Sequence, residues 1–448
     1  MASSTRNQFA SFFFIYVILH LVLVTWNHSI PPYMDEPFHF NQTRSFSKLN
    51  FSWDPKITTP PGLYLFSTPV LFLLRYFSLF LPESFLLLIC RSVNALFSIL
   101  TVLVAKQLFP TSPTSVPFSI VFFPFLFFYS HLFYTDHGSF LFLLLFWNTL
   151  KKSAPKVSFI SFLFAVIALL FRQTNIIHLS AIFYFQIFAP LFRILVVTNT
   201  NALSEIPLKL ITFSITIIKH CYLMVILLLS FISFFILNDF SIVLGDKNAH
   251  KLVLHPAMIV YFSLFSVYLL PEILAIFYRA IFRLKYSPIK IINVLLLQSF
   301  VYYFIFVYFL EIRISHLYLI SDNRHYFFYF YKNIIQKFSP YILAIIPCIL
   351  FSLLTTSLYI LQNFKGILFL FFNLIPIILT PLCESRYFIS PILLTLIVLF
   401  KPRTQLKHYY KTISFIRILF ALLINLFTIL MFHKPFKQLD GTISRFVW

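Results

Sequence analysis

The chain has 448 residues, of which 60% are hydrophobic and 10% are charged, and its formal net charge is +21. A soluble globular protein carries about 25% charged residues, so this composition excludes that class. Apolar runs near or above 18 residues recur from end to end and predict transmembrane helices. We therefore expect an all-α polytopic membrane protein with a single domain over 1–448.

The positive charge lies mainly in short loops between apolar runs. This distribution is typical of the positive-inside bias of membrane proteins and of contact with anionic lipids, which explains the high net charge. We expect no nucleic-acid partner. The four cysteines stand apart with no CxxC pattern, so they support neither a disulfide framework nor a structural metal site. Arg6 precedes the first apolar run, which favours an uncleaved signal anchor.

A polar segment, 27–62, follows the first apolar run and carries an acidic motif. Three of the 13 acidic residues lie within it, namely Asp35, Glu36 and Asp54. Ionisable residues at a membrane boundary cost free energy, so this loop is a candidate functional site. The alternative is an acidic pair on the loop surface that caps the following helix.

Asp35 and Glu36 are adjacent, so on a helix their side chains would point about 100° apart and only one could face a given pocket. A buried carboxylate there can act as a general base for a hydroxyl group. His39 lies one helical turn after Asp35 and is expected to be its neighbour. Pro60 and Pro61 suit the first turn of a helix and predict a helix start.

The next apolar stretch, 63–106, predicts two helices split near Pro82–Glu83. Further helices are expected at 158–171, 175–191, 211–237, 256–278, 291–310, 340–362, 366–382, 388–400 and 413–432. Some of these segments are short for a membrane span, so we expect about 11–14 passes rather than one number.

Three basic loops set the expected orientation. They are 151–156, 279–290 and 401–411, and we place all three in the cytosol. The polar segments then converge on the opposite face: 33–62, 134–139, 171–175, 244–250, 316–326 and 384–387. This arrangement predicts an active site on the non-cytosolic side of a helix bundle.

Three of these polar segments carry arginines that could bind phosphate. They contain Arg172 with Gln173 and Asn175, then Asp322, Arg324 and His325, and finally Arg386. Arginine pairs with phosphate oxygens through two parallel hydrogen bonds. An arginine at a helix end can also simply extend to the interface. Three such clusters on one face favour headgroup binding.

Eight segments together resemble one family, the dolichyl-phosphate-glucose-dependent α-1,2-glucosyltransferases of the endoplasmic reticulum, which add the last glucose to the lipid-linked oligosaccharide used for protein N-glycosylation. These segments are YMDEPFH (33–39), FSWDPKITTPPGLYLFS (51–67), YTDHGS (134–139), FRQTNII (171–177), LGDKNAH (244–250), SDNRHYFFY (321–329), ESRYF (384–388) and RFVW (445–448). They span nearly the whole chain in the expected order.

The resemblance implies a GT-C glycosyltransferase fold with a luminal active site in the endoplasmic reticulum membrane. It implies a dolichyl phosphate glucose donor and a diphosphodolichol-linked glycan acceptor, with no sugar-nucleotide domain. We expect a monomer without metal or other cofactor. As hypotheses, Asp35 is the general base, Glu36 and His39 support it, and Arg324 and Arg172 neutralise the leaving phosphate. The other candidates for donor or acceptor binding are Asp54, Gln173, Asn175, Asp322, His325 and Arg386.

Three alternatives remain open. The first is another dolichyl-phosphate-sugar-dependent GT-C transferase, which a donor-swap assay would distinguish. The second is a transporter or lipid scramblase, although such proteins carry polar groups near the midplane and often inverted repeats. The third is a non-catalytic membrane regulator, whose role would survive loss of Asp35.

Overall fold

The computed structural model describes residues 2–77, 81–197, 205–247, 250–284, 286–313, 322–400, 407–438 and 441–448. Helices make up most of this part of the chain, and its strands are limited to one short antiparallel pair. Within these described ranges, eight helices are long and apolar enough to cross a membrane. The prediction of an all-α polytopic membrane protein is confirmed.

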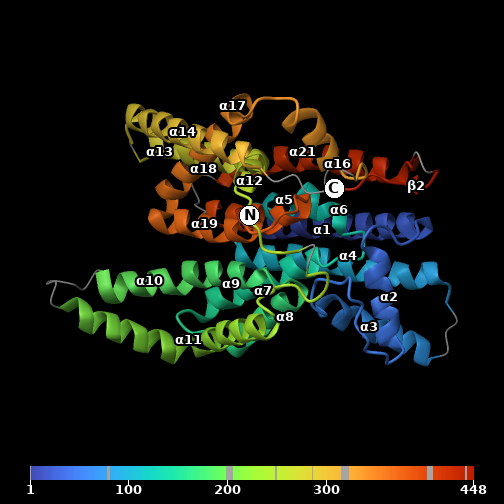
Figure 1. Cartoon of the computed structure of the whole chain (residues 1–448). Helices are drawn as coiled ribbons and strands as arrows, with labels where there is room; N and C mark the ends of the chain where they lie inside the picture. Colours follow the sequence, from blue (N-terminus) through green and yellow to red (C-terminus); the bar gives the residue numbers. More distant parts are fainter. Residues whose placement is uncertain are drawn as a thin grey trace. The chain divides into compact units, whose positions relative to one another are not determined.

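The chain forms two compact units (Figure 1). The first comprises Met1–Leu108 and Tyr129–His250, and the second comprises Phe109–Phe128 and Lys251–Trp448. The chain passes from the first unit into the second, returns, and leaves again. Whether the chain behaves as the single domain expected from its sequence stays a prediction.

The first unit is built around helix α7, which packs against α4, α8 and α9. Its elements are α1 (Ala2–Trp26), η1 (Asn27–Ser29), α2 (Glu36–Ser47), α3 (Gly62–Tyr76), α4 (Glu83–Leu108), α7 (Asp136–Ser153), α8 (Phe159–Phe171), α9 (Asn175–Phe183), η2 (Tyr184–Phe188), α10 (Ala189–Phe192), η3 (Arg193–Val197) and α11 (Ile206–Leu237). Helix α8 begins at a side-chain cap, because the Ser158 hydroxyl accepts a hydrogen bond from Ser161 N and satisfies a free donor of the first turn.

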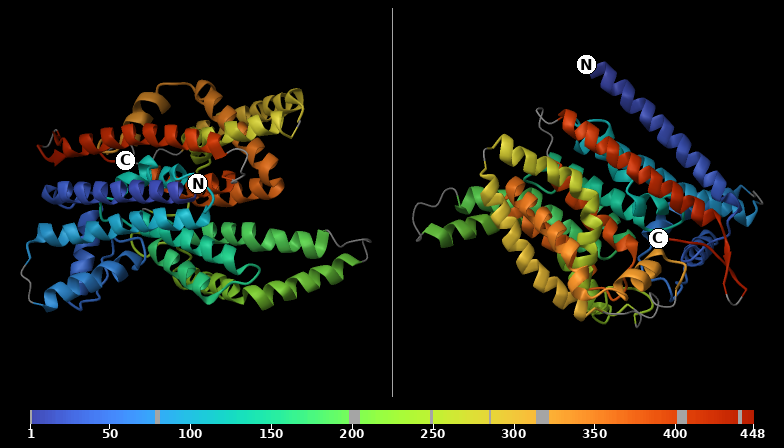
Figure 2. Two further views of the ribbon diagram at one scale, coloured as in Figure 1. Left: turned by 180° about the vertical axis from the view of Figure 1, so that it is seen from behind. Right: turned by 90° about the horizontal axis from the view of Figure 1, so that it is seen from above.

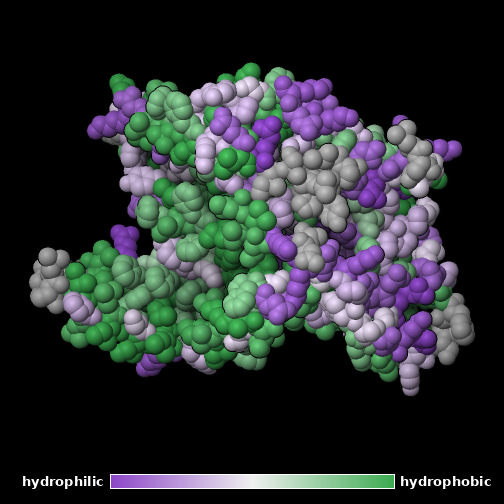
Figure 3. Space-filling view, in the orientation of Figure 1, coloured by the Kyte–Doolittle hydropathy of each residue, from purple (hydrophilic) through white to green (hydrophobic). Residues whose placement is uncertain are grey.

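The two ends of the first unit differ in polarity. Helices α2 and α3 lie at one end and α10 and α11 at the other (Figures 1 and 2). Hydrophilic residues gather over the α2 end, whereas the surface of α10 and α11 is mainly hydrophobic (Figure 3). Leu208, Ile215 and Ile218 of α11 are exposed apolar side chains, as expected for a helix surrounded by lipid.

The second unit is built around α18, which packs against α12, α13, α14 and α19. Its elements are α5 (Ser115–Val121), α6 (Pro124–Tyr129, whose last residue belongs to the first unit), α12 (Ala257–Phe265), η5 (Ser266–Leu269), α13 (Leu270–Phe282), α14 (Pro288–Glu311), α16 (Tyr326–Phe330), η6 (Tyr331–Ile335), α17 (Pro340–Leu343), α18 (Ile345–Gln362), α19 (Phe364–Ile378), η7 (Ser385–Phe388), α20 (Ile389–Leu399), α21 (Lys407–His433), β1 (Phe436–Lys437) and β2 (Ile443–Ser444). The α13–α14 junction and the β1–β2 pair lie at opposite ends of this unit (Figures 1 and 2).

Each helix predicted after residue 158 is present, with ends shifted by a few residues, and the predicted split near Pro82–Glu83 is confirmed by the separate helices α3 and α4. Among the described residues, four shorter apolar helices accompany the eight long ones. The expected count of about 11–14 passes requires such shorter helices to cross as well, and it stays a prediction.

The acidic segment predicted as a loop contains helix α2. Pro37 occupies its first turn, where a missing N–H costs nothing, and Glu36 there also interacts favourably with the positive end of the helix dipole. Arg44 lies in the last turn, where a positive charge is favoured. The polar composition of 36–47 hid this helix, because it lacks a long apolar face.

Within each unit the basic and the polar segments lie apart. Helix α7 has Asp136 at its first residue and Lys151 and Lys152 in its last turn, and an 18-residue helix is about 27 Å long. In the second unit, the 279–290 junction and α16 lie at opposite ends (Figure 1). Several residues of the predicted loops lie outside the described part of the chain: Asn248 and Ala249, Lys285, 314–321, and 401–406.

Candidate active site

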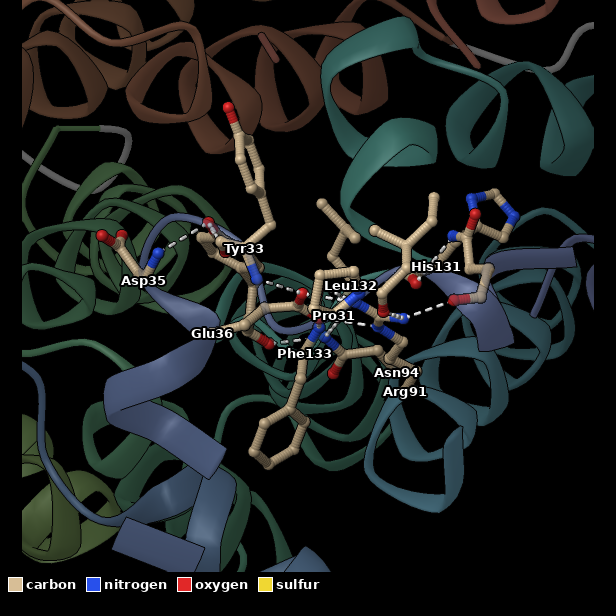
Figure 4. Close-up of polar contacts among 12 residues, drawn as sticks. Pro31, Tyr33, Asp35, Glu36, Arg91, Asn94, His131, Leu132 and Phe133 are labelled. Atoms are coloured by element: carbon tan, nitrogen blue, oxygen red, sulfur yellow. Dashed lines mark hydrogen bonds and ion pairs between the residues drawn. The ribbon is translucent and has the colours of Figure 1, made fainter. Parts of the chain in front are cut away.

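The acidic motif forms a tight turn that leads into α2. Met34 has a φ of 57°, in the left-handed region that costs a side chain free energy. Asp35 follows it at the N-cap position of α2 and is half-buried. Its backbone N donates to the hydroxyl of Tyr134 at 3.2 Å, and that hydroxyl lies 3.4 Å from Tyr33 O, to which it donates (Figure 4). The turn is therefore tied to a segment about a hundred residues away.

Glu36 is fully buried and fully engaged. Its Oε1 accepts from Arg91 Nε at 2.9 Å and from Phe133 N at 2.7 Å. Its Oε2 accepts from Arg91 Nη2 at 2.6 Å and from Tyr33 N at 3.1 Å. The side chains of Glu36 and Arg91 are both 0% exposed. The alternative of a surface pair is thus wrong for Glu36, whose carboxylate is an internal anchor.

Arg91 extends from α4 and satisfies three backbone carbonyls besides Glu36. Its Nη1 donates to Asn27 O at 2.7 Å and to Ile30 O at 3.0 Å, and its Nη2 donates to Pro31 O at 3.4 Å. The guanidinium therefore holds the whole stretch between α1 and α2 (Figure 4).

Asn94, one turn further along α4, holds the other side of the site. Its Nδ2 donates to Leu132 O at 2.6 Å and to Tyr134 O at 2.7 Å. Asn27 adds a third link, because its Nδ2 donates to His131 O at 3.2 Å. One face of α4 thus connects the acidic turn before α2 to the 131–134 segment, which contacts that turn.

His39 and Asp54 gather around a tyrosine that the sequence did not indicate. The Nδ1 of His39 is hydrogen-bonded to the Tyr64 hydroxyl at 2.7 Å. The ring of Trp53, the residue before Asp54, has its centroid 5.7 Å from that of the Tyr64 ring. Asp54 is half-buried and its Oδ1 accepts from Lys56 N at 2.9 Å. The turn and the loop after α2 therefore share one polar cluster.

Arg172 is paired with a carboxylate from another motif. Its guanidinium lies 2.8 Å from Asp136 Oδ1, and its Nε donates to Thr135 Oγ1 at 3.3 Å. Asp136 is almost fully buried and Arg172 is about one-sixth exposed. Arg172 thus lies next to the Tyr134 segment that contacts Asp35.

Gln173 and Asn175 make contacts that connect the motifs of the first unit. Gln173 Nε2 donates to Thr58 O at 2.7 Å, and Asn175 Nδ2 donates to Ser139 Oγ at 2.8 Å. Leu244 N also donates to Thr58 O, at 3.1 Å. Segments that are far apart in the sequence therefore assemble around the loop after α2.

The remaining candidates lie in the second unit. Arg324 contacts Asp322 through two bonds, Nε to Oδ1 at 2.7 Å and Nη2 to Oδ2 at 2.8 Å. His325 Nε2 lies 3.6 Å from Asp322 Oδ2. Burial alone would raise the pKa of the Asp322 carboxyl, but Arg324 and His325 outweigh it and lower that pKa. Asp322 is therefore ionised at neutral pH, and Arg386 forms a similar pair with Glu384.

The terminal RFVW motif packs against this second group. Val447 N donates to Arg324 O at 2.9 Å, and Tyr326 N donates to Val447 O at 3.0 Å. The rings of Tyr326 and Trp448 have centroids 5.0 Å apart. Two motifs separated by more than 100 residues thus form one structural element.

The predicted site residues therefore fall into two groups, one in each unit. Sequence reasoning missed Arg91, Asn94, Tyr64 and Tyr134. Arg91 carried a usable signal, because an arginine inside an apolar run is expensive and is a functional hypothesis by default. Among the described residues, there is no group of three or more His, Cys, Asp or Glu side chains that could hold a metal ion.

The fold and the site together define a polytopic membrane protein in which the first residue of α2, Glu36, carries a buried charge that is paired with Arg91. The sequence model of the DIE2/ALG10 family matches residues 29–397, and the chain belongs to this family. The resemblance found in the motifs is thereby confirmed.

The similar proteins include several named Dol-P-Glc:Glc(2)Man(9)GlcNAc(2)-PP-Dol alpha-1,2-glucosyltransferase. Those from Mus musculus, Candida albicans and Arabidopsis thaliana are each 28% identical to this chain. The aligned regions cover 93%, 89% and 94% of this chain and 93%, 91% and 96% of the three relatives, respectively. No solved structure matches the chain.

Proposed function

We propose that this protein transfers glucose from dolichyl phosphate glucose, in α-1,2 linkage, to a diglucosylated diphosphodolichol-linked oligosaccharide. The reaction is the last step in assembling the precursor for protein N-glycosylation, at the luminal face of the endoplasmic reticulum membrane. Family membership over residues 29–397 is the observation that carries this proposal. The name shared by relatives that align over most of their length supports it.

In the proposed step, Asp35 takes the proton from the 2-hydroxyl of the terminal glucose of the acceptor. The hydroxyl oxygen attacks the anomeric carbon of the β-linked donor and forms the new bond. The bond from that carbon to the phosphate oxygen breaks, and dolichyl phosphate leaves with the electron pair. In-line displacement inverts the centre and gives an α linkage. Two observations support this role. Asp35 is only half-buried, and the carboxylate of its neighbour Glu36 already accepts four hydrogen bonds.

Arg324 and Arg172 are the proposed partners of the leaving phosphate. Preorganised positive charge at the place where negative charge develops lowers the barrier. Arg324 is about one-third exposed and Arg172 about one-sixth exposed, and each is already paired with a carboxylate, Asp322 and Asp136 respectively. A phosphate would therefore share or replace that carboxylate, which limits non-specific anion binding.

The other candidates would bind the donor or the acceptor. His39, together with Asp54, would contact acceptor hydroxyls from the Tyr64 cluster. Gln173 and Asn175 would shape the Arg172 side of the site. Asp322 and His325 would orient Arg324, and Arg386 would contact the donor headgroup. A mainly apolar, membrane-embedded protein suits a donor whose lipid tail must remain in hydrocarbon.

The direct test uses purified protein with dolichyl phosphate glucose and a diglucosylated lipid-linked acceptor. The expected product is one hexose heavier and loses that hexose to an α-1,2-specific glucosidase. A parallel reaction with dolichyl phosphate mannose should give no product. Transfer from the mannosyl donor alone would indicate a different transferase of the same class, and no transfer from either donor would contradict the proposal.

A further inference from the structure

We infer that Arg91 is a positioning residue for Asp35, acting through Glu36, and that Asn94 is the second arm of the same device. This inference rests on the proposed function, because it takes Asp35 as the group that receives the acceptor proton. Arg91 and Asn94 lie three residues apart on α4 and therefore on one face of the helix. Together they hold both polypeptide segments that contact Asp35.

The first arm is the buried charge pair. Arg91 reaches both carboxylate oxygens of Glu36, at 2.9 and 2.6 Å, and the two side chains are 0% exposed. Removing two charges from water carries a large desolvation penalty, so hydrophobic residues of similar volume would often serve stability equally well. For a buried pair next to a candidate base, fixed geometry is therefore a better explanation than stability.

The Arg91–Glu36 pair fixes Asp35, the residue directly before α2. Glu36 accepts from Tyr33 N and Arg91 donates to Ile30 O, so the contacts enclose the turn on both sides. Met34, inside the turn, has a left-handed backbone with a φ of 57°. Such a conformation persists only where surrounding contacts hold it. Asp35, the next residue, thus takes its direction from a turn that Glu36 and Arg91 maintain.

The second arm fixes the partner of the turn. Asn94 Nδ2 donates to the carbonyls of Leu132 and Tyr134. The hydroxyl of Tyr134 in turn accepts from Asp35 N. Figure 4 draws Arg91 and Asn94 together with residues of both segments. Arg91 and Asn94 therefore set the position of Asp35 through both of the segments that surround it.

A purely structural role is the competing explanation, and the second unit offers a matched control. Glu272 on α13 and Arg417 on α21 form another buried charge pair, with side chains 1% and 2% exposed. Among the described contacts, Arg417 lies over the ring of Tyr268, at 5.1 Å, and not against a candidate site residue. Neutralising this pair should affect stability without moving Asp35.

The main experiment compares two double variants in which both charges are removed. Glu36→Gln/Arg91→Met should fold, but its kcat should fall roughly 10²-fold with little change in either KM, because a displacement of about 1 Å is enough for such a loss. Glu272→Gln/Arg417→Met should keep kcat near the wild-type value. Thermal unfolding in detergent reports folding for both. A folded Glu36→Gln/Arg91→Met protein with wild-type kcat would overturn the inference.

Two further measurements cover the case in which that double variant does not fold. Arg91→Lys keeps the charge opposite Glu36 but lacks the fork that reaches three carbonyls, so it should fold and lose part of its kcat. Hydrogen exchange of a peptide covering residues 30–40 should be faster in Arg91→Lys and in Asn94→Ala than in wild type. Unchanged exchange and unchanged kcat in both would refute the inference. Because exchange needs no substrate, inactivity of the wild-type protein with dolichyl phosphate glucose would refute the proposed function alone.

Discussion

Asp35 and Glu36 are adjacent in the chain, but their carboxylates have different surroundings. Glu36 is enclosed by Arg91 and two backbone N–H groups, whereas Asp35 is half-buried and its backbone N donates to the hydroxyl of Tyr134. The four hydrogen bonds that Glu36 accepts occupy both of its carboxylate oxygens, which leaves little room for a substrate hydroxyl. This arrangement supports Asp35 as the proposed base.

At the same scale, we predict that Arg324 acts through its fork geometry. Arg324→Lys keeps the charge but loses the paired bonds, so the rate of glucosyl transfer should fall partially. Arg324→Ala loses the charge as well, so the rate should fall severely. The defect should appear in the dependence of rate on donor concentration, with acceptor binding unchanged. Arg313, which donates to Leu310 O at the end of α14, provides the control. Arg313→Lys should behave as wild type, and wild-type kinetics for Arg324→Lys would remove Arg324 from the site.

The sequence led to Asp35 as the hypothetical base with Glu36 in support, but it could not show how differently the two residues are surrounded. That difference arises from Arg91, 55 residues from Glu36, and from the backbone of Phe133, almost 100 residues away. Residue types and local spacing carry no information on such partners. The same holds for Arg172, whose pairing with Asp136 follows from the packing of α7 against α8.

At the scale of elements, the close approach of α3 to α8 requires a glycine. A Cβ at Gly62 would lie 2.5 Å from the backbone C and O of Leu170, just before Arg172. We expect Gly62→Ala to lower the free energy of unfolding by about 1–3 kcal/mol, because backbone cannot move aside as a side chain can. Thermal unfolding in detergent measures this change, and an unaltered transition would show that the two helices are less closely packed.

The apolar helices were predictable because their signal is continuous and local. Helix α14, for example, runs from Pro288 to Glu311 where 291–310 was expected. Helix α2 was not predicted, since its sequence EPFHFNQTRSFS has no run of apolar residues. It is stabilised instead by packing against α3 and by contacts of Glu36 and His39 that come from distant segments.

At the scale of the whole molecule, the distribution of charge predicts which face each loop occupies. All four cysteines are buried, so introduced cysteines can be labelled selectively. In sealed microsomes, Lys152→Cys and Lys290→Cys should react with an impermeant thiol reagent from the cytosolic side. Lys48→Cys, at the C-terminal end of α2, should react only after the membrane is opened. The opposite pattern would reverse the predicted orientation and move the candidate site to the cytosol.

The turn that ends in Asp35 is the proposed catalytic centre. The most direct measurement is glucosyl transfer by purified Asp35→Asn at saturating donor and acceptor. This change keeps the size of the side chain but removes the base, so turnover should fall by ~10²–10⁴-fold while thermal unfolding stays unchanged. Near-normal turnover of a folded Asp35→Asn protein would contradict the account and place the base elsewhere.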